Sequence, residues 1–98
     1  FNGIAVLTQT ANITVLAGAN DSDAIDLTMT DLSAIGSATY TITGADGTAA
    51  RAALATIDTN LETVSTARAT LGAGQNRLQS AVNNLTNVST NLSDARSR

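Results

Sequence analysis

The chain has 98 residues and contains no Cys, His, Trp, Pro or Lys. Without Cys and His, the common nucleophile–base pairs, disulfides and zinc sites are unavailable, so we expect neither an enzyme nor a metal or other cofactor. The five basic residues are scattered arginines and the formal net charge is −3, which argues against nucleic-acid binding.

No apolar run approaches the roughly 18 residues of a membrane span, so no membrane contact is expected. No charged and then apolar signal peptide opens the chain, and its first residue is Phe rather than Met. We therefore expect this sequence to be a piece of a longer polypeptide.

The first half of the chain has the two-residue period of β-strands. Apolar residues alternate with polar ones around Ile13 and Val15 and again from Ile25 to Met29, and the turn-forming residues 18–23 lie between the two runs. This pattern predicts a β-hairpin within 12–30. A two-stranded hairpin is marginal alone and needs something to pack against.

Shorter elements are predicted between the hairpin and residue 48. Residues 31–36 fit one helical turn opened by Asp31. The alternation of residues 38–43, with Tyr40 and Ile42 on one face, predicts another short strand before the loop 44–47.

From Thr48 the period becomes helical and runs without Pro to Arg98, with Asp46 or Thr48 as the predicted N-cap. One heptad position is apolar at six successive repeats, and a second is mixed. The first set is Ile57, Val64, Leu71, Leu78, Leu85 and Leu92, and the second includes Leu54, Leu61, Arg68, Gln75, Val82, Ser89 and Arg96. We expect Leu54, Ile57, Leu61, Val64, Leu71, Leu78, Val82, Leu85 and Leu92 to serve helix packing and assembly.

A helix over 48–98 would be about 75 Å long at roughly 1.5 Å per residue, too long to fold back into a compact domain. Its apolar stripe therefore needs partner helices, and the first half is too short and too β-like to supply them. The expected fold is mainly α with a small β part: a β-hairpin followed by one long bundle or coiled-coil helix, incomplete without further helices.

Several segments of the chain resemble bacterial flagellins. The run from Leu71 to Leu78, Leu-Gly-Ala-Gly-Gln-Asn-Arg-Leu, is similar to the flagellin signature, and 91–98 resembles the stretch that precedes the terminal core helix of flagellins. At the front, Phe1-Asn2-Gly3 and the turn at 18–21 are similar to the flagellin hairpin region. The resemblance is dense over 54–98 and thin over 1–48.

The resemblance implies that 1–47 is the hairpin region and 48–98 the long C-terminal helix of the flagellin shell domain. It implies a structural subunit of the extracellular bacterial flagellar filament, secreted, self-assembling by helix packing and serving motility. The implied partners are other flagellin subunits, N-terminal helices of the full-length chain, a flagellar export chaperone and the host Toll-like receptor 5.

Receptor recognition is also implied for particular residues. The family positions implicated on the C-terminal helix match Ile57, Leu61, Thr66 and Arg77. Thr66, Gln75, Asn76 and Arg77 are the candidate signature and receptor surface. Since Ile57 and Leu61 lie in the apolar stripe, their loss would act mainly through folding.

Simpler interpretations accompany these hypotheses. Asp21, Asp23 and Asp26 lack the Gly and distal Glu of a calcium loop and fit solvated turn acids. Asp58 and Glu62 are four apart but have no aromatic or phosphate-binding neighbours, so they fit ordinary helix charges. Two other functions remain open: a hook-filament junction protein, which shares flagellin-like ends, and a generic coiled-coil interaction module, which would leave 1–30 unexplained.

Overall fold

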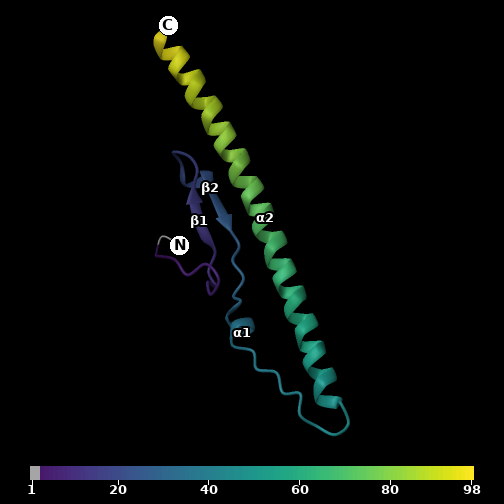
Figure 1. Cartoon of the computed structure of the whole chain (residues 1–98). Helices are drawn as coiled ribbons and strands as arrows, with labels where there is room; N and C mark the ends of the chain where they lie inside the picture. The colour runs from purple at the N-terminus through teal and green to yellow at the C-terminus, as the bar shows by residue number, and fades with distance from the viewer. Residues whose placement is uncertain (1–2) are drawn as a thin grey trace. The chain divides into compact units, whose positions relative to one another are not determined.

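The computed structural model of the chain describes residues 3–98, so Phe1 and Asn2 of the Phe-Asn-Gly similarity lie outside the described residues. The elements are β1 (Ile13–Leu16), the short 3-10 helix η1 (Asp21–Asp23), β2 (Ala24–Leu27), α1 (Ser33–Gly36) and α2 (Thr48–Ser97), as Figure 1 shows. The predicted fold class, mainly α with a hairpin followed by one long helix, is confirmed. The chain forms two compact units: the residues up to Thr10 with Met29–Ala69, and Ala11–Thr28 with Thr70–Arg98.

The hairpin pairs β1 and β2 antiparallel. Ile13 lies opposite Leu27 and Val15 opposite Ile25, so these four apolar residues share one face of the hairpin. On the other face the Thr14 hydroxyl donates to the Asp26 carboxylate over 2.6 Å. The register therefore follows from the alternation in the sequence, because a slip by one residue would turn the apolar face outward.

The hairpin turn is held by Asp23. Its carboxylate accepts the backbone N–H of Asn20 at 3.0 Å, and the backbone N–H of Asp23 donates to the Asn20 carbonyl at 3.0 Å. The Ala17 N–H donates to the Asp23 carbonyl, also at 3.0 Å. The acidic turn residue thus satisfies backbone donors that would otherwise depend on water.

The connecting segment contains the predicted helical turn but not the predicted strand. The Asp31 carboxylate accepts the backbone N–H of Ser33 at 2.8 Å in front of α1. Hydrogen bonding to the side chain and the backbone of Ser33 lowers the pKa of Asp31. The strand predicted over 38–43 is wrong, since the sheet in residues 3–98 consists of β1 and β2 alone. Alternating side chains cannot make a strand where no neighbouring strand offers a hydrogen-bonding edge.

Helix α2 begins directly after a tight loop. Gly47 has φ +71°, in the left-handed region that glycine adopts without strain. Of the two predicted N-cap residues, Thr48 is the first residue of α2, and the carboxylate of Asp46 accepts its backbone N–H at 3.2 Å. Hydrogen bonds from the backbone and side chain of Thr48 lower the pKa of Asp46. One of the unpaired donors at the helix start is satisfied in this way.

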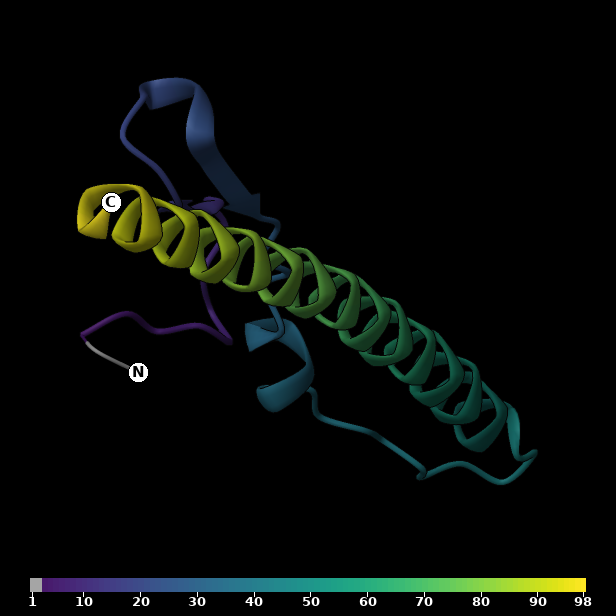
Figure 2. The same ribbon diagram turned by 90° about the horizontal axis from the view of Figure 1, so that it is seen from above.

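In the first unit, the segment between α1 and α2 runs beside the first turns of α2, which Figures 1 and 2 show from two directions. The Asn60 side-chain amide of α2 donates to the Tyr40 hydroxyl over 2.7 Å. Near the start of the chain, the Leu32 N–H donates to the Leu7 carbonyl at 2.9 Å. Few such bonds hold this unit, so side-chain packing on α2 must supply the rest.

In the second unit, the apolar face of the hairpin meets α2. Gly74 is buried, and a Cβ placed on it would lie 2.8 Å from Cδ2 of Leu27. Gly72, only two residues away, is exposed, and a Cβ there would meet nothing within 4 Å. The absence of a side chain at 74 therefore lets the hairpin approach the helix, whereas Gly72 has no comparable packing role.

Tyr40→Phe combined with Asn60→Ala in a double-mutant cycle tests the contact in the first unit. We expect a coupling free energy of about 0.5–1 kcal/mol, because both groups are partly exposed and can bond to water when separated. Urea unfolding followed by circular dichroism measures it. A coupling free energy indistinguishable from zero would show that the hydrogen bond does not stabilise the unit.

Gly72→Ala and Gly74→Ala form a matched pair for the second unit. Gly72→Ala should raise the free energy of unfolding by about 1 kcal/mol, because Ala is the better helix former. Gly74→Ala gains the same propensity but forces Leu27 to move, and overpacking costs about 1–3 kcal/mol. Gly74→Ala should therefore be the less stable of the two in urea titrations. Equal stabilisation by both would contradict close hairpin packing at Gly74.

Candidate assembly surface

One face of α2 carries small residues at a seven-residue spacing and is covered by the chain's own first half. Its members are Ala53, Asn60, Ala67, Gly74 and Ala81, all buried or half-buried. We call these five residues the small face. The hydrophobic-residue pattern missed it, because alanine and glycine contribute little to a search for large apolar side chains. The signal was nevertheless present as a small or short side chain at five successive heptad positions.

In the first unit the small face includes the most buried alanine of α2. Ala67 is only 5% exposed, and Ala53 and Asn60 are half-buried. A depression of about 280 Å³ remains where the connecting segment crosses the helix. It is lined by Thr39, Tyr40, Thr41, Ala49, Ala52, Ala53 and Thr56. Alanines here bring the two backbones close without filling the space between them.

In the second unit Gly74 and Ala81 continue the small face under the hairpin. A depression of about 370 Å³ lies between the hairpin turn and the helix, lined by Ala17, Gly18, Ser22, Asp23, Ala24, Ile25, Ala81, Asn84 and Leu85. Asp23 already accepts hydrogen bonds from Asn20 within the turn. The hollow therefore presents mostly small groups and a carboxylate engaged in holding the loop.

The predicted packing stripe lies beside this small face and is mostly uncovered. Val64 and Leu78 are half-buried, and the remaining members are exposed. The exposed side-chain fractions are 62% for Leu54, 37% for Ile57, 62% for Leu61, 44% for Leu71, 55% for Val82, 43% for Leu85 and 65% for Leu92. The role of the nine stripe residues in assembly stays a prediction.

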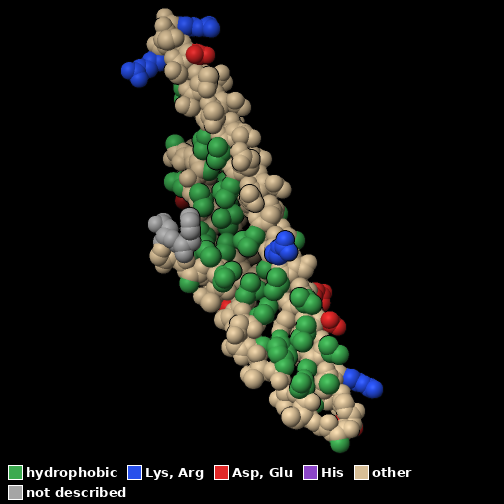
Figure 3. All heavy atoms as spheres, in the orientation of Figure 1, with side chains coloured by type: hydrophobic (Ala, Val, Ile, Leu, Met, Phe, Trp, Pro, Cys, Tyr) green, Lys and Arg blue, Asp and Glu red, His purple; other side chains and the backbone are tan. Residues whose placement is uncertain are grey.

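Coverage of the predicted packing stripe changes from one heptad to the next. Within the second unit Leu78 is half-buried, while Leu85 and Leu92, at the same heptad position, are 43% and 65% exposed. Figure 3 shows hydrophobic side chains gathered along the hairpin and the connecting segment, and mostly other side chains on the last turns of α2.

The four candidate receptor residues are all exposed. Gln75, Asn76 and Arg77 are consecutive in α2, so their side chains leave the helix about 100° apart and do not form one surface. Arg77 reaches the hairpin, where its guanidinium nitrogen Nη1 donates to the Asp26 carbonyl at 3.5 Å. The family-derived receptor role of Thr66, Gln75, Asn76 and Arg77 stays a prediction.

Hydroxyl groups along α2 bond to their own helix. Thr56, Thr59, Thr63, Thr86 and Thr90 each donate to the carbonyl four residues earlier, over 2.8–3.0 Å. Ser80 donates to the Asn76 carbonyl in the same way at 3.0 Å. Covering these threonines with a neighbouring helix would therefore leave no hydroxyl proton without an acceptor.

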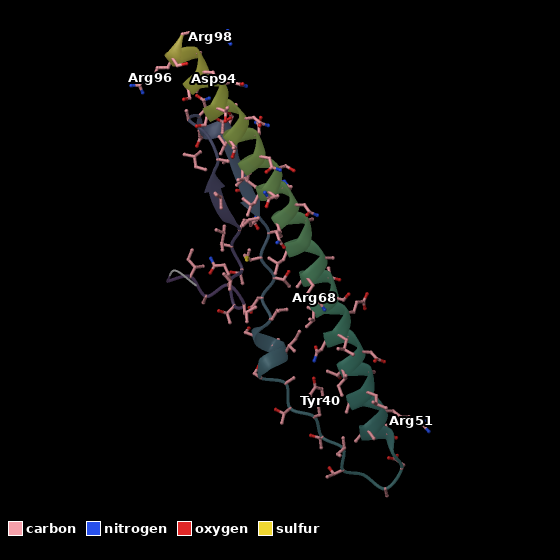
Figure 4. All side chains as sticks on the ribbon, turned by 45° about the horizontal axis from the view of Figure 1, so that its top comes forward. Tyr40, Arg51, Arg68, Asp94, Arg96 and Arg98 are labelled. Carbon is pink, nitrogen blue, oxygen red and sulfur yellow. The ribbon has the colours of Figure 1, made fainter. Side chains whose placement is uncertain are left out.

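Charged groups offer no site of another kind in the part of the chain that the structure describes. Over residues 3–98 no three His, Cys, Asp or Glu side chains are grouped so that they could hold a metal ion. Arg96 and Arg98 extend from the C-terminal end of α2, close to Asp94 (Figure 4). Of the helices among these residues, none combines the length and the apolarity that crossing a membrane requires.

Comparison with known proteins finds similarity to bacterial flagellins. The pattern of the bacterial flagellin C-terminal helical region matches residues 54–98. The chain is 44% identical over its whole length to a flagellin of Halalkalibacterium halodurans, of which it covers 37%, and 38% identical over its whole length to the putative flagellin YvzB of Bacillus subtilis, of which it covers 64%. A B-type flagellin of Pseudomonas aeruginosa is 46% identical over 62% of the chain, which covers 12% of that protein.

The chain thus spans less than two thirds of the length of each of these relatives. No solved structure gives a significant match. The similarity to two flagellins runs through both the hairpin and the long helix, and the C-terminal flagellin pattern covers most of α2. These similarities together support the assignment of this chain to the bacterial flagellins.

Proposed function

We propose that this chain is part of a structural subunit of the bacterial flagellar filament, which assembles by helix packing and serves motility. The observation that carries the proposal is the division of α2 into two kinds of face. Its small face is covered within the chain, while large apolar side chains beside it, such as Leu54, Leu61 and Leu92, are more than half exposed.

Exposed leucines in a regular row are the feature that assembly would use. Fully burying a leucine side chain contributes about 1.5–3 kcal/mol, so covering several of them along one helix provides a strong driving force. N-terminal helices of the full-length polypeptide and neighbouring subunits are the proposed covers. Contacts of this kind that repeat head to tail without closing into a ring produce an open filament.

The same proposal assigns the segments, the location and further partners. Residues 1–47 act as the hairpin region and 48–98 as the long helix of one shell domain, supported by the way the hairpin packs at Gly74. The subunit is secreted and joins the extracellular filament. Before secretion it binds an export chaperone. It has no catalytic role, in keeping with a sequence that lacks Cys and His and a family of structural proteins.

Replacing two exposed leucines tests assembly separately from folding. Leu54→Gln combined with Leu61→Gln in the full protein should leave the free energy of unfolding within about 0.5 kcal/mol per site, because Gln and Leu have similar helix propensities and both sites are exposed. Filament formation should fall sharply, since the covered apolar area is lost. Electron microscopy of shed filaments and swimming in soft agar measure the effect.

Ser65→Gln is the matched control for the leucine variant. Ser65 is exposed on α2 and lies outside the predicted packing stripe, so its replacement should leave filaments and swimming normal. Normal filaments in the leucine variant would contradict the proposed surface. Loss of helix content in that variant would show instead that Leu54 and Leu61 serve folding of the subunit.

Arg77→Ala tests the proposed contact with Toll-like receptor 5. In the structure the Arg77 side chain makes one long hydrogen bond to the Asp26 carbonyl and is otherwise exposed, so the change should barely affect folding. We expect swimming to stay near normal and receptor activation to drop, because a guanidinium can donate several hydrogen bonds to a partner. Unchanged receptor activation would contradict the receptor role, and loss of filaments would make Arg77 an assembly residue.

A further inference from the structure

The loop before α2 holds the only Asp-Gly sequence of the chain, Asp46-Gly47. Both residues are exposed. Gly47 has no side chain to shield its backbone nitrogen, and a Cβ placed there would meet nothing within 4 Å. The other aspartates of the chain precede residues with side chains: Asp21, Asp23, Asp26, Asp31, Asp58 and Asp94.

We infer that Asp46-Gly47 is a site of spontaneous isoaspartate formation, and that this modification removes the cap of α2. The Gly47 nitrogen attacks Cγ of the protonated Asp46 carboxyl group and a C–N bond forms. The amide proton and the carboxyl hydroxyl leave together as water, and a five-membered imide results. Water then adds to one of the two imide carbonyls and breaks its C–N bond. Opening at the backbone carbonyl yields isoaspartate, with no net change in composition.

The cap contact links this chemistry to the start of the helix. Oδ1 of Asp46 accepts the Thr48 N–H over 3.2 Å, toward the long end of hydrogen-bond distances. Closing the imide ring requires the carboxyl group to leave that N–H, so the reaction proceeds from molecules in which this cap contact has broken. The folded chain should therefore react severalfold more slowly than the unfolded chain.

The product cannot restore the contact. Isoaspartate routes the backbone through the former side chain, which adds a methylene to the main chain and leaves a shorter carboxylate in a different place. The Thr48 N–H then loses its acceptor, and the first turn of α2, which includes the half-buried Ala49, opens more often.

The pH dependence follows from which form of the carboxyl group reacts. Hydrogen bonds with Thr48 hold the pKa of Asp46 below its ordinary value. The ionised group is the poorer electrophile, since it must lose an oxide rather than a hydroxyl. The isomerisation should thus be faster at mildly acidic than at neutral pH. In the folded, capped chain this increase in rate should begin at a lower pH than in the unfolded chain.

The experiment is to age the full chain at mildly acidic and neutral pH, folded and in urea, and to locate isoaspartate by electron-transfer fragmentation. Fragmentation at residue level is needed because Asn2-Gly3 also forms an imide, although its deamidation changes the mass. We expect isoaspartate at position 46, formed severalfold faster in urea, and little at Asp21 or Asp58. Amide hydrogen exchange at Thr48 should be severalfold faster in the isolated isoaspartyl chain than in the unmodified chain.

Two variants calibrate the measurement. Asp46→Asn forms the same imide with ammonia as the leaving group and should convert faster, whereas Asp46→Glu would need a six-membered ring and should stay unmodified. Absence of isoaspartate at position 46 after Asp46→Asn has fully converted would overturn the modification site. Equal rates in folded and unfolded chains, or unchanged exchange at Thr48, would overturn its link to the cap.

Discussion

The structure depends on close approach between α2 and the first half of the chain. In each unit this approach occurs over residues with small or absent side chains: Ala67 in the first unit, and Gly74 beneath Leu27 in the second. A glycine inside a helix lowers its intrinsic stability by about 1 kcal/mol. At Gly74 that cost is offset by the apolar hairpin face that can reach the helix, which lets a marginal two-stranded hairpin remain folded.

Because the first half of the chain covers α2 at its small residues, the large apolar side chains of α2 remain exposed for other contacts. A helix that buried its leucines under its own hairpin would have little apolar surface left for neighbours. Here Leu54 and Leu61 are exposed while the half-buried Ala53 and Asn60 precede each of them in sequence. The side-chain size at adjacent heptad positions thus separates folding of the chain from the association that we propose for it.

Local periodicity correctly predicted the elements whose formation is determined by nearby residues. The hairpin follows from alternation around Val15 and Ile25, and α2 from an unbroken heptad position without Pro. The strand over 38–43 was predicted wrongly, because pairing depends on a distant edge that alternation does not reveal. The small face was missed because the burial of an alanine or a glycine depends on which distant segment packs on it, and the sequence around it does not show that segment. Arg77, a candidate receptor residue, is exposed, and its long hydrogen bond to the Asp26 carbonyl could not be predicted from local periodicity.

The threonines that donate to their own helix affect how firmly a neighbour could be held in register. Thr56, Thr59 and Thr63 direct their protons to carbonyls of the preceding turn, so they present methyl groups outward but no unused donor. A neighbouring rod packed on such a surface would be held by contact area rather than by hydrogen bonds donated by these threonines.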